Sequence, residues 1–281
     1  MNSKLTLLFF CTLYIIKSAA QPSLNFNKRF VECEDKWVAF SITKDSTYPY
    51  GFIYIDEQAG LTFDLAGFMK IDAIGKFIPG KLDTFSMKYR LEPNNVKIAL
   101  IPESKFDELE LLPVPDWLEI YKTTNDSVGR MVRWGYFYNH WGESAKALTY
   151  LEKAYKLNPG YKNAEFELAF AYNALERFND AIMVLEKAIV RTPKECLLYK
   201  ELSYAQIHIE QLEKASESCT KGIRSCDDKK MKAEIAYNLT YSYFSKKDKA
   251  NFEVWARETK KWADAESIFS KNIALMEKDL K

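Results

Sequence analysis

The amino-acid sequence predicts an α+β protein of two domains, a small β-rich N-terminal domain followed by an all-α solenoid. Up to about residue 122, short runs of aromatic and β-branched residues alternate with turn-forming residues, which is typical of strands. From residue 126 onward, longer segments rich in Ala, Leu, Lys and Glu recur with a period of 34 residues. A fixed period of this length is typical of stacked helical hairpins.

The composition excludes some classes of function. The 281 residues include 40 Lys or Arg, 39 Asp or Glu and 2 His. This near-neutral balance gives no bulk attraction to nucleic acid or to an anionic membrane, so we expect no nucleic-acid partner. Hydrophobic residues make up 47% of the chain and charged residues 28%, as in a folded globular protein.

The first 20 residues have the pattern of a cleaved secretory signal. An apolar run, Leu5–Ile16, follows Lys4, and small residues, Ser18 and Ala20, stand before Gln21. The run is shorter than the roughly 20 residues that a spanning helix needs; an uncleaved anchor is the alternative. We therefore expect a signal peptide at 1–20 and an exported chain, periplasmic or secreted, with no stable membrane insertion after cleavage.

Export would place four cysteines in a compartment that permits disulfides. Cys33, Cys196, Cys219 and Cys226 allow three complete pairings. Buried free thiols are the alternative, because a chain of this length does not need disulfides to fold. No Cys-x-x-Cys or Cys/His spacing indicates a zinc site, and we expect neither a metal nor a cofactor.

Residues 21–124 form the expected β-rich domain, whose function the sequence does not indicate. Pro113 and Pro115 interrupt the short helical segments that lead out of it. The candidate strands, bounded by turn-forming stretches, are Trp37–Ile42, Gly51–Asp56, Leu61–Met69, Lys88–Leu91 and Val96–Ile101.

Residues 128–161 align with residues 162–195 over their full length. In each segment a bulky and a small residue are followed by an aromatic residue, then by Leu-Glu-Lys-Ala, then by proline. The small residues let two antiparallel helices approach closely, and the proline ends the second helix. The matched residues are Trp134, Gly135, Tyr138, Leu151–Ala154 and Pro159 in the first segment, and Leu168, Ala169, Tyr172, Leu185–Ala188 and Pro193 in the second.

This pattern resembles the tetratricopeptide repeat, whose unit is a helix–turn–helix. The resemblance covers about 128–281 and implies three to four repeats. A third repeat, 196–229, has Gln206 where the aromatic residue belongs, and a degenerate fourth, 233–266, follows a three-residue insertion. Apolar residues at helical spacing over 262–281 predict a C-terminal capping helix that covers the last repeat.

The resemblance implies that the first helices of the repeats line one concave wall, which this family generally uses to bind a peptide or protein. On this wall we expect aromatic residues that receive apolar side chains and asparagines that hydrogen-bond an extended backbone. The alternative is that individual residues pack against a neighbouring helix or the N-terminal domain. The expected wall residues are Tyr136, Asn139, His140, Phe166, Phe170, Asn173, Tyr204, His208 and Tyr241.

Some members of this family bind C-terminal carboxylates with basic residues on the same wall. The matching positions here are not basic, so we expect no carboxylate clamp. They hold Val132, Tyr136, Glu167, Leu197 and Glu201.

Catalysis is the less favoured class of function. His140 and His208 occupy equivalent positions two repeats apart, and at roughly 10 Å per helical layer they would be too far apart to share a metal ion. No nucleophile, zinc-protease or phosphate-binding motif occurs. An enzyme would therefore need a carboxylate site in the N-terminal domain.

The sequence thus predicts an exported, non-enzymatic scaffold that binds an extended peptide or partner protein in an aromatic groove. The second hypothesis is a self-assembling structural adaptor whose groove is filled by its own N-terminal domain, and the oligomeric state is left open. Within the third repeat, Cys196 opens the first helix and Cys226 closes the second. Because the helices are antiparallel, these ends should be close, and we expect a disulfide between them.

Overall fold

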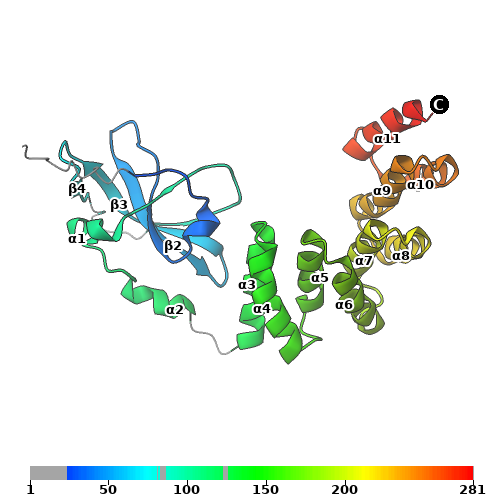
Figure 1. The fold of residues 1–281 in the computed structure, drawn as a ribbon, viewed down its shortest axis with the longest axis horizontal. Coiled ribbons are helices and arrows are strands. Elements are labelled where there is room, and N and C mark those ends of the chain that lie inside the picture. Colours follow the sequence, from blue (N-terminus) through cyan, green and yellow to red (C-terminus); the bar gives the residue numbers. More distant parts are fainter. Residues whose placement is uncertain (1–23, 81, 83–86, 123–125, 281) are drawn as a thin grey trace, which may run out of the picture. The chain divides into compact units, whose positions relative to one another are not determined.

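The computed structural model describes residues 24–80, 82, 87–122 and 126–280 (Figure 1). The expected signal peptide, 1–20, lies outside these residues. The chain divides into two compact units, one up to Leu118 and one from Glu119 onward, with the turn Asp56–Gly60 counted in the second. The sheet of the first unit and the helical array of the second confirm the α+β, two-domain prediction.

The described part of the first unit is built on a six-stranded sheet. The long strands β2 and β3 are at its centre and are rich in aromatic and β-branched residues, as strands require. The strand order is β4-β3-β2-β1-β6, and β5 also pairs with β3. The strands are β1 (Lys36–Ala39), β2 (Tyr48–Asp56), β3 (Gly60–Ile71), β4 (Phe77–Ile78), β5 (Met87–Arg90) and β6 (Ala99–Leu100).

Aromatic side chains form much of the core of this unit. Phe52 and Tyr54 on β2 are fully buried, and the ring of Trp117 meets them edge-on at 5.9 and 5.0 Å between centroids. The indole nitrogen of Trp37 donates a hydrogen bond to the Leu112 carbonyl at 2.7 Å. The segment after the sheet is therefore fixed to its core by side chains at two points.

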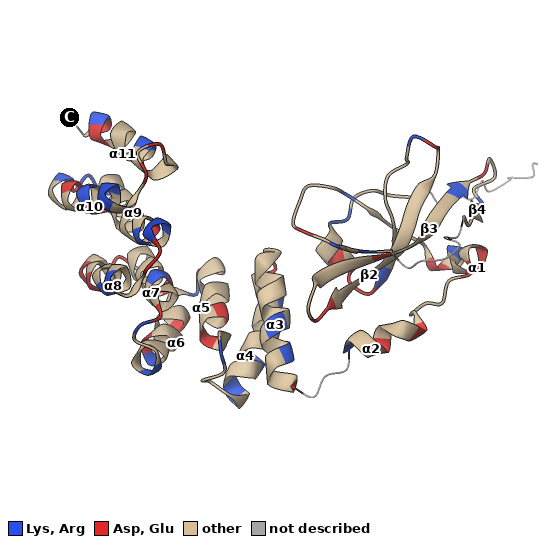
Figure 2. Ribbon diagram, turned by 180° about the vertical axis from the view of Figure 1, so that it is seen from behind, with Lys and Arg blue, Asp and Glu red and all other residues tan. Residues whose placement is uncertain are grey.

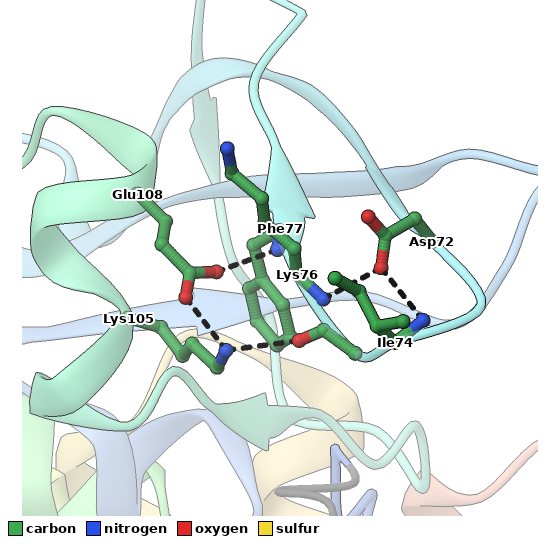
Figure 3. A network of polar contacts seen from close by, with 7 residues as sticks. Asp72, Ile74, Lys76, Phe77, Lys105 and Glu108 are labelled. Carbon is green, nitrogen blue, oxygen red and sulfur yellow. Dashed lines mark hydrogen bonds and ion pairs between the residues drawn. The ribbon is translucent and has the colours of Figure 1, made fainter.

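A polar network joins helix α1 (Phe106–Leu109) to the β3–β4 hairpin (Figure 3). The carboxylate of Glu108 accepts hydrogen bonds from the Phe77 N–H at 2.6 Å and from the Lys105 ammonium at 2.8 Å. Lys105 also donates to the Gly75 carbonyl at 2.9 Å. The hydrogen bond from Lys105 is the main reason that the pKa of Glu108 is lowered. Glu108 thus has a structural partner on each oxygen.

The described part of the second unit contains four consecutive helical hairpins and a final helix (Figure 1). None of the helices described by the structure is both long and apolar enough to cross a membrane. The hairpins are α3 (Ser127–His140) with α4 (Ser144–Leu157), α5 (Ala164–Ala174) with α6 (Phe178–Arg191), α7 (Cys196–His208) with α8 (Leu212–Ser225), and α9 (Lys229–Ser245) with α10 (Lys249–Trp262).

The residue that faces the second helix is small in the first three repeats. A Cβ atom on Gly135 in α3 would lie 2.3 Å from Cγ of Leu151 in α4, so the helices meet where no side chain intervenes. In the fourth repeat the small pair is replaced by Thr240 and Thr259. Their hydroxyls lie 2.9 Å apart in a buried hydrogen bond, so a polar contact substitutes for close approach.

The capping helix is shorter than the sequence predicted. We expected a helix over 262–281, but α10 ends at Trp262 and the final helix, α11, spans Ile268–Asp279. The reason is a local N-cap: the Ser267 hydroxyl accepts the N–H of Ser270 at 3.3 Å. Helix α11 still buries Ile273 and Met276 against the core of the third and fourth repeats.

Cys196, at the start of α7, and Cys226, after the end of α8, form a disulfide that closes a segment of 30 residues. The other two cysteines, Cys33 and Cys219, are buried free thiols. Burial raises their pKa values to about 11 and about 12, respectively. The thiolate form, which reacts with oxidants, is therefore disfavoured at both of them.

The contact at Gly135 predicts a specific sensitivity to added volume. Gly135→Val should destabilise the solenoid by about 1–3 kcal/mol, because Leu151 must leave a packed position. Thermal unfolding followed by circular dichroism would measure the loss. Gly160→Val is the matched control, since a Cβ atom there meets nothing closer than 3.9 Å. Equal melting temperatures for the two variants would contradict the close helix contact.

The disulfide predicts a second stability effect. Cys226→Ser should lower stability by about 2–4 kcal/mol, because the crosslink restricts the unfolded chain. Treatment with a reductant should destabilise the parent protein to a similar degree and leave the variant unchanged. A free-thiol count on the unfolded, non-reduced protein should find thiol at Cys33 and Cys219 only; thiol at Cys196 would refute the bond.

Candidate functional site

The candidate site lies on the inner face of the solenoid, by which we mean the side of the first helices α3, α5, α7 and α9 that faces away from the second helices. The residue after each inward small residue points to this face, because one residue rotates a helix by about 100°. At this position every repeat has an exposed aromatic residue. We call them the aromatic ladder: Tyr136, Phe170, Tyr204 and Tyr241, with exposed fractions of 45, 37, 36 and 55%.

Two pockets lie between successive members of the ladder. The first, of about 300 Å³, is lined by Phe170 and Tyr204 together with Asn173, Glu201 and Asn238. The second, of about 470 Å³, is lined by Tyr204 and Tyr241, with His208, Tyr237 and Lys246 among the other residues. Because the pockets share Tyr204 and Asn238, we treat them as one groove that crosses α5, α7 and α9.

The two histidines stack on ladder residues. The ring of His140 lies 6.2 Å from that of Tyr136, with the ring planes 16° apart. The ring of His208 lies 4.1 Å from that of Tyr204 and 4.8 Å from that of Phe178. Its Nδ1 atom is 2.8 Å from the Tyr204 carbonyl oxygen. These contacts hold the ladder rings in place, and the described residues contain no group of three metal-ligating side chains.

The two asparagines differ from the sequence expectation. Asn139 and Asn173 are only 6 and 4% exposed and do not offer their amides to a partner. Each side-chain NH₂ group instead donates to the next repeat, at 2.9–3.1 Å, where it meets both the main-chain oxygen and the carboxylate of one glutamate. These glutamates are Glu167 and Glu201. The amides therefore align neighbouring repeats.

The glutamates that receive these bonds are themselves buried, at 7 and 6% exposure. Burial raises the pKa of both Glu167 and Glu201, and the hydrogen bond from the asparagine opposes this effect in each case. Carboxylates at these positions also rule out the basic clamp that some proteins of this architecture use. Val132, at another clamp position, is buried in a small apolar cluster.

The other expected wall residues divide into two groups. Phe166 is half-buried and lies beside Phe170, with ring centroids 6.5 Å apart. Tyr241 lies beside Tyr237, whose ring packs on Phe269 of the final helix at 5.0 Å. The wall thus continues from the ladder to α11, although only the ladder residues are strongly exposed.

Sequence reasoning missed Asn238 and Glu234 on the groove. Asn238 stands immediately before Leu239, as Glu167 and Glu201 stand before Leu168 and Leu202. The alignment could therefore have placed it at the groove position. Glu234 carries no such signal, because its role depends on an ion pair with Lys200 of the preceding repeat, at 2.7 Å.

The charged side chains of the groove are paired within the solenoid. Besides Lys200 and Glu234, Lys246 donates to Glu210 at 2.8 Å. Figure 2 shows residues of both signs distributed over the helices of the second unit. The groove itself therefore presents aromatic rings, hydroxyls and amides, with its charges neutralised locally.

Two larger pockets lie elsewhere in the second unit. One, of about 500 Å³, is lined by Trp262, Lys232 and Lys261, whose ammonium groups lie 4.4 and 4.6 Å from the indole. The other, of about 590 Å³, is lined by residues of α10 and α11. Neither uses a position that recurs along the repeats, so the groove is the candidate site.

Comparison with known proteins agrees with the helical architecture. The model of the tetratricopeptide repeat family matches residues 142–207. These residues are tetratricopeptide repeats. The match covers the second helix of the first repeat, the whole second repeat and most of α7, which confirms the resemblance inferred from the 34-residue period.

Solved structures also resemble the tetratricopeptide region, and they bear on the fold alone. One is MamA, from residue 41 to its end, of Desulfovibrio magneticus RS-1, with 18% identity over 58% of this chain and 83% of that one, at a TM-score of 0.44. Another is TTC0263, a thermophilic tetratricopeptide-repeat protein of Thermus thermophilus, with 16% identity over 62% and 91%, at a TM-score of 0.47. No curated protein matches the sequence.

The buried glutamates predict an unusual dependence of stability on pH. Because the folded-state pKa of Glu201 is raised, the folded protein binds more protons than the unfolded chain between the unfolded and folded values. Stability therefore falls as pH rises through that interval. Glu201→Gln keeps an acceptor for Asn173 and removes the charge. It should raise the melting temperature at about pH 8 and lose this advantage toward about pH 4.

Thermal unfolding across this pH range would test the effect. Glu186→Gln, an exposed residue on α6, is the control for removing a carboxylate from the same unit. Parallel pH profiles for the parent and for Glu201→Gln would show that burial imposes no cost on this carboxylate.

Proposed function

We propose that this chain is an exported, non-enzymatic scaffold whose groove holds an extended segment of a partner protein. One observation carries the proposal: four successive repeats place an exposed aromatic residue at the same position, and pockets lie between these residues. Exposed aromatic groups in a pocketed row are typical of protein-interaction surfaces. The tetratricopeptide fold itself is a protein-interaction scaffold.

The groove suits a segment of extended chain better than a small molecule. Its pockets are shallow and open into each other across three helices, whereas small-molecule sites bury most of the ligand in one cavity. The hydroxyls of Tyr204 and Tyr241 and the amide of Asn238 can hydrogen-bond peptide groups. No catalytic role is assigned to His208, since its ring is engaged by Tyr204 and Phe178.

Export is part of the proposal. The pattern of residues 1–20 supports it, and so does the Cys196–Cys226 disulfide, because such bonds persist mainly in oxidising compartments. Fractionation of the producing cells, with sequencing of the mature N-terminus, would test it. An N-terminus at Gln21 in the exported fraction agrees with the proposal, and an intact Met1 retained in the cytoplasm contradicts it.

Photo-crosslinking in the native host would test the groove. A photo-reactive amino acid in place of Tyr241 or Tyr136 should give adducts with one defined segment of a partner protein. The same group in place of Val190, which is 82% exposed on α6, is the control for random encounters. The variant Tyr136→Ala/Phe170→Ala/Tyr204→Ala should lose the partner while its circular-dichroism spectrum stays helical.

Other results of this experiment would favour other functions. Adducts between the ladder and residues of the chain's own N-terminal domain would support the self-assembling adaptor instead. Equal adducts from position 190 and from the ladder would remove the argument for the groove. Partner recovery that is unchanged in the triple variant would do the same.

A further inference from the structure

The spacing and chemistry of the aromatic ladder point to one conformation of the bound segment. We propose that the groove takes an uncharged, proline-rich segment of a partner protein in the polyproline II conformation, with every third residue placed on the ladder. This inference rests on the proposed function and specifies the partner's chemistry.

The distance between ladder positions carries the first step. The first helices of successive repeats pack directly against one another, and packed helices lie about 8–10 Å apart. A polyproline II helix rises about 3.1 Å per residue with three residues per turn, so the same face recurs about every 9.3 Å. Its turns therefore match the ladder one for one.

The other regular conformations match less well. In a β-strand alternate residues face opposite sides and the same face recurs about every 6.6 Å, so a third residue points away from the ladder. In an α-helix the pitch is about 5.4 Å, so only every second turn would meet a ladder residue. A strand would leave ladder positions unused, and a helix would contact them with about one residue in seven.

Hydrogen-bonding chemistry supports the same conformation. A polyproline II segment makes no internal hydrogen bonds, and proline has no N–H, so the segment presents carbonyl acceptors alone. The groove offers donors beside its rings: the hydroxyls of Tyr204 and Tyr241 and the amide of Asn238. Aromatic-lined grooves with such donors are a general means of recognising proline-rich segments.

The charges of the groove select an uncharged occupant. Lys200 is paired with Glu234 at 2.7 Å and Lys246 with Glu210 at 2.8 Å, while the Glu201 carboxylate accepts from Asn173 at 2.9 Å. A charged segment would have to break one of these pairs or leave its own charge without a partner in the groove. A neutral segment makes neither demand, so it is complementary to this lining.

Fluorescence anisotropy with the full chain would test the inference. The probe is a fluorescein-labelled peptide of twelve prolines, and a Gly-Ser peptide of equal length is its control. We expect saturable binding of the proline peptide, weakened about tenfold in Phe170→Ala/Tyr204→Ala, because the variant removes two adjacent aromatic contacts with the segment. Met183→Ala, an exposed residue on α6, should leave the affinity unchanged.

A second pair of unlabelled competitors tests the period of three. A peptide of four Pro-Ala-Ala units should compete better than a peptide of the same composition with irregularly spaced prolines. Equal competition by the two peptides would overturn the assigned register. Absence of binding by the twelve-proline probe, or binding that the ladder variant does not weaken, would overturn the inference itself.

The failure of this inference can be told apart from the failure of the proposed function. If ladder positions crosslink to a partner segment but the proline probe does not bind, the groove still functions and only the conformation is wrong. An amphipathic helical peptide that binds the ladder where the proline probe does not would replace polyproline II with a helix. If neither crosslinks nor peptide binding depend on the ladder, the proposed function falls as well.

Discussion

The solenoid depends on the close contact between the two helices of each repeat. The first helix approaches the second at Gly135, Ala169 and Ser203, and the fourth repeat makes the equivalent contact at Thr240 through a hydroxyl pair with Thr259. This contact fixes the rotation of the first helix about its own axis. The next residue along the chain must then face away from the second helix, which creates the ladder. Packing inside a repeat and exposure on its inner face are thus two results of one constraint.

A second interaction sets the position of each repeat relative to the next. Asn139 bonds to Glu167, and Asn173 repeats the bond to Glu201 with the same 28-residue separation. Burying a carboxylate is costly, and the raised pKa values of both glutamates reflect that cost. A directional bond to a fixed main-chain oxygen and a carboxylate gives register that apolar packing alone does not provide. The ladder therefore keeps its spacing across these repeats.

The sequence predicted the parts of the structure that depend on local spacing. The period of 34 located the helical hairpins and placed all four ladder residues on the inner face. It failed at Asn139 and Asn173, because a polar residue near an exposed aromatic suits a partner and a neighbouring repeat equally well. It also failed before Ser267, where a hydroxyl cap of about 1 kcal/mol starts a new helix although the apolar spacing continues. A hydrophobic period contains neither the position of a neighbouring repeat nor the effect of a cap.

The four repeats can also be compared with one another, and the comparison separates packing from recognition. The buried contact position changes from Gly to Ala, Ser and Thr, and the facing residue changes from Ala154 to Thr259, so packing tolerates several solutions. The ladder position is aromatic in all four repeats although its side chains are 36–55% exposed. Large exposed rings contribute little to the core and reduce solubility. Stability therefore does not explain why this position is aromatic in every repeat, whereas contact with a partner along the groove does.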